Sequence, residues 1–152
     1  MHDTRPKPSG ETLGFMQVMF GLVHALDVRS KRMAHTIGVT GPQRLVVRMI
    51  GQRAGRTATE IAELLEMHPS TLTGVLARLE KRGAIVRDID VNDRRRSRFR
   101  LTATGRRIDK ERRGTVEAAV RRALGRAETV SVTHTEGLMR LLAAELMREE
   151  DE

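Results

Sequence analysis

Three consecutive arginines, Arg94, Arg95 and Arg96, stand at the tip of a β-hairpin that we predict from residues 85–90 and 97–102. Arg98 follows on the return strand, where apolar and basic residues alternate. Guanidinium groups donate paired hydrogen bonds to phosphate oxygens and to the edge of guanine. Adjacent arginines also repel one another unless a polyanion lies nearby. This cluster therefore favours nucleic-acid binding over a merely solvated turn.

A helix with small outward residues is predicted directly before the hairpin, over residues 69–82. Its buried stripe consists of Leu72, Val75, Leu76 and Leu79. A solvated surface helix more often carries Glu and Lys on the opposite face, whereas this face carries Ser70, Gly74, Ala77 and Lys81, flanked by Thr71, Thr73 and Arg78. With a shorter helix from Thr57 to Leu65 it forms a helix-turn-helix that fits a DNA major groove.

The positive charge of the chain is concentrated in this same segment. The whole sequence has 28 Lys and Arg against 20 Asp and Glu, a net charge of +8. Residues 40–107 contain 15 basic and 7 acidic residues, so they account for the entire excess. Because each neutralised phosphate releases counterions, a basic excess gathered in one module predicts a polyanionic partner.

Composition excludes several other classes of protein. The chain has no cysteine, which excludes a disulfide framework and a thiolate metal site. No apolar run reaches the ~20 residues of a membrane span, and the N-terminus lacks an apolar signal core, so we expect a cytoplasmic protein without a membrane partner. The sequence contains no glycine-rich phosphate loop, clustered carboxylates or catalytic triad. We therefore expect no enzyme activity, no cofactor and no metal.

The remaining segments are predicted to be helical, which gives a mostly α fold with a small β-hairpin. We expect a loose arm over residues 1–9, a helix over 10–38, a winged helix-turn-helix region over 40–105, further helices over 106–148 and an acidic tail over 149–152, all in one domain. The helix that begins after Thr40 should bury Leu45, Val46, Met49 and Ile50. One long helix is expected from Ala103 to Arg126, and Thr133–Glu136 is predicted to be the capping box of the last helix.

Three short strings carry a resemblance to a known family. Leu79–Gly83 leads into Arg87 and is followed by Asp93-Arg94-Arg95, and the hairpin closes with Leu101–Gly105. In this order the strings resemble the MarR family of bacterial winged helix-turn-helix regulators. The resemblance implies a homodimer whose N- and C-terminal helices interlace. It also implies that two winged modules bind double-stranded DNA at a pseudo-palindromic operator, with repression as the commoner outcome.

The resemblance also implies roles for individual residues. The helix 69–82 would enter the major groove, Arg94 or Arg95 would enter the minor groove, and Asp93 would fix that arginine through a bidentate pair. The candidate DNA-binding residues are Thr57, Thr59, Ser70, Thr71, Thr73, Gly74, Arg78, Asp93, Arg94, Arg95, Arg96 and Arg98. Plainer interpretations stay open, since Thr57 also serves as a helix cap, Asp93 favours a turn beside Asn92, and Thr71 and Thr73 suit any surface.

Family members often release DNA when a small molecule, commonly an anionic aromatic, binds beside the dimer helices. The candidate effector-pocket residues are Met16, His24, Met33, Arg48 and Met49. The chain has no tyrosine or tryptophan, so few aromatic side chains are available to stack on a flat ligand. A low-specificity architectural DNA-binding protein of the same fold is the alternative function, which would rely on charge more than on base contacts.

Overall fold

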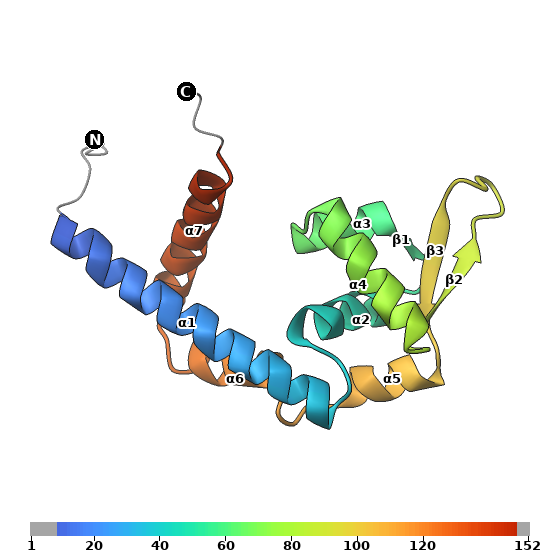
Figure 1. Ribbon diagram of the computed structural model, residues 1–152, viewed down its shortest axis with the longest axis horizontal. Coiled ribbons are helices and arrows are strands. Elements are labelled where there is room, and N and C mark those ends of the chain that lie inside the picture. Colours follow the sequence, from blue (N-terminus) through green and yellow to red (C-terminus); the bar gives the residue numbers. More distant parts are fainter. Residues whose placement is uncertain (1–8, 149–152) are drawn as a thin grey trace. The chain divides into compact units, whose positions relative to one another are not determined.

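The computed structural model describes residues 9–148 and forms two compact units, one through Val116 and one from Glu117 (Figure 1). The expected acidic tail, and residues 1–8 of the expected arm, lie outside the described residues. Ser9 is already the first residue of a helix.

Helices dominate the first unit, as expected, and a small sheet accompanies them. The long helix α1 ends at Thr36, and Gly38 follows it with a left-handed φ of 89°, as the sequence predicts for a helix stop. Capping boxes begin α2 at Thr40 and α3 at Thr57. The elements are α1 (Ser9–Thr36), α2 (Gly41–Gln52), β1 (Arg56–Thr57), α3 (Ala58–Leu65), α4 (Pro69–Lys81), β2 (Ile85–Ile89), β3 (Ser97–Leu101) and α5 (Ala103–Lys110).

The predicted hairpin is confirmed, and it gains a third strand that sequence patterns do not predict. β3 lies in the middle of an antiparallel sheet with the order β1-β3-β2, in which Phe99 is opposite both Arg56 and Arg87. Phe99 and Leu101 are buried, as their alternation predicts. The short strand β1 therefore ties the start of α3 to the base of the hairpin.

The first and the last of the family-like strings meet where the hairpin ends. Thr102 caps α5 by accepting the Gly105 N–H at 3.1 Å, and its hydroxyl donates to the carbonyl of Gly83 at 2.6 Å. Gly105 packs so closely on Ala84 that a Cβ built there would lie 2.0 Å from the Ala84 carbonyl oxygen. The close approach explains why this position holds glycine, and it fixes α5 against the end of α4.

The core of this unit brings α2, α3, α4, α5 and the sheet together around buried aliphatic side chains and Phe99. The predicted burial of Leu45 is wrong, because this side chain is exposed, and Met49 is only half-buried. Arg44 is buried instead. The Arg44 guanidinium donates to the carbonyls of Ile108 and Glu111 at the end of α5. The buried arginine links the two helices, because its donors bind carbonyls at the end of α5, where the Ile108 carbonyl also accepts the Glu111 N–H at 3.3 Å.

The expected single helix from Ala103 to Arg126 is also wrong. α5 ends at Lys110, the backbone is extended at Glu111, and Gly114 takes a left-handed φ of 71° before α6 (Val116–Leu124) begins. The Glu111 carboxylate accepts the backbone N–H groups of Arg113 and Arg112, which lowers the pKa of that carboxyl below its usual range. Local hydrogen bonds thus replace the helical ones at the break.

In the second unit, α7 (Thr129–Leu146) begins four residues before the predicted capping box. Thr133 and Thr135 lie inside the helix, where their hydroxyls donate to the carbonyls of Thr129 and Ser131. Neither α6 nor α7 contains a buried residue. Their exposed apolar side chains include Val120, Leu124, Val130, Leu138, Met139, Leu141 and Leu146.

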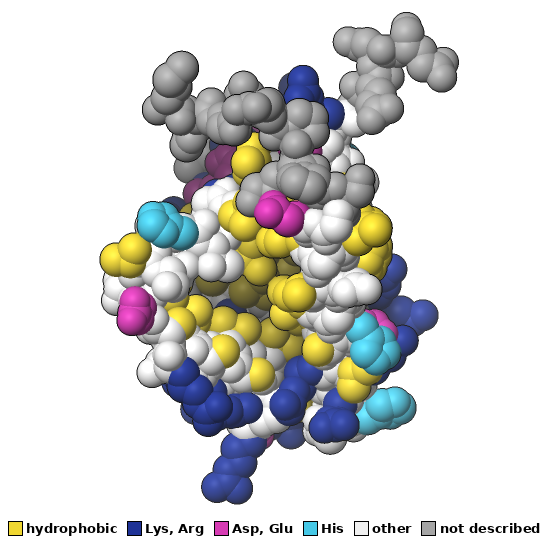
Figure 2. Space-filling model, turned by 90° about the vertical axis from the view of Figure 1, so that its left-hand side faces the viewer, with side chains coloured by type: hydrophobic (Ala, Val, Ile, Leu, Met, Phe, Trp, Pro, Cys, Tyr) yellow, Lys and Arg dark blue, Asp and Glu magenta, His cyan; other side chains and the backbone are white. Residues whose placement is uncertain are grey.

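Apolar side chains are likewise exposed along most of α1. The side chains of Val18, Phe20 and Leu22 are all more than half exposed. Met33, near the end of the helix, is fully buried. Figure 2 shows hydrophobic side chains gathered on the face that it draws. Among the described residues, no helix is both long enough and apolar enough to cross a membrane.

Candidate DNA interface

The helix predicted over residues 69–82 is confirmed as α4, with the expected residues on its outer side. Ser70, Thr71, Thr73 and Arg78 are exposed and Gly74 is half-buried, while the stripe headed by Leu72 packs into the core. The Thr73 hydroxyl donates to the Pro69 carbonyl at 2.9 Å. Within the described residues the Arg78 side chain makes no hydrogen bond or ion pair, so it is free to bind a phosphate or a base.

His68 begins α4, a role that the sequence patterns above do not reveal. Its Nδ1 atom accepts the Ser70 N–H at 3.2 Å and lies 2.7 Å from the Ser70 hydroxyl. Glu66 precedes it with a left-handed φ of 49°, which makes the turn of the helix-turn-helix. A polar residue directly before a proline is the sequence signal that could have identified this cap.

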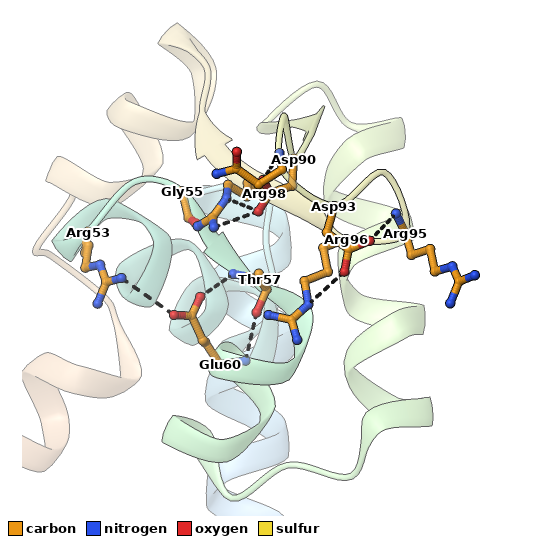
Figure 3. A network of polar contacts seen from close by, with 10 residues as sticks. Arg53, Gly55, Thr57, Glu60, Asp90, Asp93, Arg95, Arg96 and Arg98 are labelled. Atoms are coloured by element: carbon orange, nitrogen blue, oxygen red, sulfur yellow. Dashed lines mark hydrogen bonds and ion pairs between the residues drawn. The ribbon is translucent and has the colours of Figure 1, made fainter.

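The start of α3 places its two threonines differently. Thr57 is buried, its hydroxyl accepts the Glu60 N–H at 3.2 Å, and the Glu60 carboxylate accepts the Thr57 N–H at 2.7 Å (Figure 3). This backbone hydrogen bond lowers the pKa of Glu60 below its usual range. Thr59 is exposed. Of the two, Thr59 is therefore the residue that a phosphate can reach, and the capping role explains Thr57.

The tip of the hairpin exposes all three arginines of the cluster, Arg94, Arg95 and Arg96. The predicted bidentate pair of Asp93 with Arg94 or Arg95 is wrong. Asp93 accepts the backbone N–H of Arg95 at 3.0 Å and lies 3.5 Å from Nε of Arg96. The first of these contacts is the turn-forming alternative, because aspartate side chains commonly bind the backbone two residues ahead.

Two guanidinium groups are consequently left unpaired at the tip. Within residues 9–148 the side chains of Arg94 and Arg95 make no hydrogen bond or ion pair, and Arg95 extends away from the loop (Figure 3). Unpaired surface cations can exchange water for phosphate oxygens without first breaking an internal pair. They are the strongest candidates for contacts made by the hairpin.

The structure does not place Arg98 among the free cations. Its Nε and Nη2 atoms each lie 2.7 Å from Oδ2 of Asp90, and its Nη1 donates to the Gly55 carbonyl at 2.8 Å (Figure 3). Arg100 similarly donates to Asp88 at 2.6 Å. Arg98 therefore has internal partners in this structure, and its direct contact with DNA stays a prediction. The sequence patterns above do not single out its partner, Asp90.

Arg87 fixes the hairpin against the recognition helix. Its guanidinium donates to both carboxylate oxygens of Glu80, at 3.1 and 3.0 Å, and lies 5.4 Å from the centre of the Phe99 ring. A bidentate pair with this stacking holds β2 and α4 in one arrangement.

The five candidate effector residues lie in different surroundings. Met16 and His24 are exposed on α1, Met33 is fully buried with its sulfur accepting the Val116 N–H, and Arg48 pairs with Asp109 at 2.6 Å. Met49 is half-buried. A cavity of about 300 Å³ lies elsewhere, between the ends of α1 and α4 and the side of α5, and is lined by Thr36, Ile37, Arg82, Thr104, Arg107, Ile108 and Glu111.

Comparisons with known proteins agree with this geometry. Residues 39–97 match the model of the MarR family. The HTH-type transcriptional repressor Rv2887 of Mycobacterium tuberculosis is 32% identical over 114 residues, which cover 75% of this chain and 81% of that protein.

Two solved structures share the fold. The S. aureus MepR–DNA complex matches with a TM-score of 0.70 and 17% identity, over 88% of this chain and 98% of that one. The PcaV regulator of Streptomyces coelicolor, solved with its natural ligand, matches with a TM-score of 0.70 and 21% identity, over 93% and 98%. The outward face of α4, the unpaired arginines of the hairpin and the similarity to Rv2887 lead to one conclusion: the chain belongs to the MarR family of DNA-binding transcriptional regulators.

Proposed function

We propose that the chain is a sequence-specific repressor that binds a pseudo-palindromic operator as a homodimer. α4 would lie in the major groove. The hairpin formed by β2 and β3 is called the wing, and its tip would reach the adjacent minor groove. The observation that carries this proposal is the set of unpaired cations, Arg78, Arg94 and Arg95, on the same winged module as the small outward residues of α4. The repressor name of Rv2887 and the solved complex of MepR with DNA support it.

Exposed apolar side chains support the homodimer. A single copy leaves Leu22 and Leu26 of α1 about half exposed, at 53% and 49%, and Leu141 of α7 at 58%. Full burial of a leucine-sized side chain is worth about 1.5–3 kcal/mol, so covering the exposed half of each of these side chains stabilises the complex by about 1 kcal/mol. Two copies could cover these faces, which water would otherwise contact.

Operator selection from genomic fragments tests the proposal. A sequence-specific regulator should bind the selected site ~10³-fold or more tightly than a random duplex, whereas an architectural protein would show a far smaller ratio. The footprint should contain two half-sites about 10 bp apart. A monomer in solution that protects a single half-site would contradict the dimer.

The wing contact has its own test. Replacing Arg94 and Arg95 by Ala should weaken binding and reduce the slope of log affinity against log salt by about 0.9 for each phosphate that the variant no longer neutralises. Arg100→Ala is the matched control, because Arg100 lies on the same hairpin but is paired with Asp88. An unchanged slope in the Arg94 and Arg95 variant would remove the wing from the interface.

We further propose that an anionic small molecule releases the DNA. The 300 Å³ cavity is large enough for a small ligand, and Arg82 and Arg107 in its lining could bind a carboxylate at the end of the recognition helix. Benzoate is a suitable probe: it should weaken operator binding by the parent protein, and the double variant Arg82→Met/Arg107→Met should lose that response. An equal response in both proteins would exclude this cavity.

A further inference from the structure

One arginine joins three parts of the winged module that are far apart in sequence. Arg98 lies on β3, Asp90 follows the last residue of β2, and Gly55 lies just before β1. The Arg98 guanidinium is within 2.7 Å of Oδ2 of Asp90 and within 2.8 Å of the Gly55 carbonyl oxygen (Figure 3). We call these three residues the wing clamp.

Asp90 controls the base of the loop that carries the free arginines. Its backbone N–H donates to the Arg96 carbonyl at 2.9 Å, and its side chain accepts the Asn92 N–H at 2.8 Å. The Asp90 side chain is only 7% exposed. The Asn92 N–H and then the Arg98 guanidinium lower the pKa of Asp90 below its usual range, so the carboxylate is charged at neutral pH. Asp90 thus closes the loop that carries the wing tip.

Gly55 connects this loop to the helices. Its N–H donates to the Phe99 carbonyl at 2.8 Å, and its own carbonyl accepts from Arg98, so β3 holds it through both backbone groups. Thr57, two residues later, caps α3, and α3 packs against α4. A bond from Arg98 to Gly55 therefore ties the base of the wing to the element that supports the recognition helix.

We infer that the wing clamp sets the direction of the wing tip relative to α4, and that Arg98 acts in DNA binding as a positioning residue rather than as a contact. The inference rests on the proposed function of the wing. A planar guanidinium suits this role, because it can bind a carboxylate and a carbonyl at once, whereas a lysine ammonium is a single point charge.

Population arithmetic gives the size of the expected effect. If loss of the clamp leaves a wing correctly placed about one tenth of the time, the factor by which that wing raises the DNA affinity falls about tenfold. A homodimer has two wings, so the expected loss in the logarithm of the operator affinity is twice the loss from one wing. The salt slope should fall as well, although Arg98 itself touches no phosphate, because Arg94 and Arg95 would no longer reach theirs.

The test compares four variants of the full chain in operator binding. Arg98→Met removes the link, Arg98→Lys keeps the charge but cannot bridge both partners, and Asp90→Asn breaks the link from the other side. Arg100→Met is the matched control, because it removes an arginine from the same strand that pairs instead with the exposed Asp88. Thermal unfolding of each variant is measured first, and binding is then compared at a temperature at which all the variants are folded.

We expect Arg98→Met, Arg98→Lys and Asp90→Asn to lose about tenfold or more in affinity, and Arg100→Met to stay within about threefold of the parent. The decisive measurement is a double-mutant cycle with the Arg94→Ala/Arg95→Ala protein. Positioning predicts that Arg98→Met weakens binding by less than about twofold in that background, since the wing arginines are already absent.

Other outcomes overturn the inference. If the affinity losses of Arg98→Met and of Arg94→Ala/Arg95→Ala are fully additive, Arg98 contacts DNA directly. If Arg98→Lys binds the operator as tightly as the parent protein, only the positive charge of Arg98 matters. If Arg94→Ala/Arg95→Ala loses much affinity while Arg98→Met binds like the parent protein, the wing clamp is refuted but the wing contact is not. No loss in Arg94→Ala/Arg95→Ala would refute the proposed wing contact itself.

Discussion

Replacing Gly74 by Ala should make the protein more stable and its DNA binding weaker. Gly74 lies inside α4, and a Cβ built there meets nothing closer than the Arg78 guanidinium, at 3.8 Å, which is an ordinary contact. Alanine in a helix interior is favoured over glycine by about 0.5–1 kcal/mol. For a protein of this length, that gain raises Tm by about 1–4 °C.

The same methyl group would stand on the side of α4 that we place against the base edges. Overpacking a close interface costs about 1–3 kcal/mol, which weakens binding by about 5- to 150-fold. Urea and thermal unfolding give the first effect, and operator titration gives the second. Gly137→Ala is the control, because nothing lies within 4 Å of its Cβ and α7 is outside the predicted DNA interface. Higher stability with unchanged or tighter operator binding would refute close approach of DNA at Gly74.

Two further predictions concern stability. Gly105→Ala should destabilise the fold by about 1–3 kcal/mol or more in urea unfolding, because the new Cβ would lie 2.0 Å from the backbone oxygen of Ala84; parental stability would contradict that packing. The pKa values of Glu60, Asp90 and Glu111 are lowered in the folded protein, so their stabilisation is fully present above their unfolded pKa values and is lost as pH falls through the lower folded values. The free energy of unfolding should therefore fall below about pH 4, and a protein that becomes more stable there would contradict the sign.

The fold could be predicted because its signals are local. Thr40 with Gln43 and Thr57 with Glu60 are capping boxes three residues apart, and the structure contains both. The stripe of α4 and the alternation of the hairpin depend on neighbours within one turn or one strand. The same local reasoning places Gly74 on the outer side of the recognition helix.

Sequence patterns mislead where distant partners or competing local bonds decide the outcome. Arg44 is buried because carbonyls 64 and 67 residues away accept its donors, which no periodicity reveals. Alternation along β3 points Arg98 to DNA, but strand pairing and the loop between the strands supply Asp90 as its partner. The capping signal at Thr133 is present, but the helix starts earlier, and the Thr133 hydroxyl donates to the carbonyl four residues back instead of capping a helix.

The pairing of charges also decides how salt should act on DNA binding. Residues 40–107 contain 15 basic side chains, but Arg87, Arg96, Arg98 and Arg100 of the hairpin each face a carboxylate. Using them on phosphate would first break an internal pair. Only Arg78, Arg94 and Arg95 among the predicted DNA-binding cations have no partner within the described residues.

Three contacts per module in a homodimer give about six phosphates, and a slope of log affinity against log salt of about −5. Titration of the operator between about 50 and 200 mM salt measures this slope. A slope steeper than about −10 would mean that the paired arginines leave their carboxylates when DNA binds. Pairing with a carboxylate would then not keep an arginine from contacting phosphate.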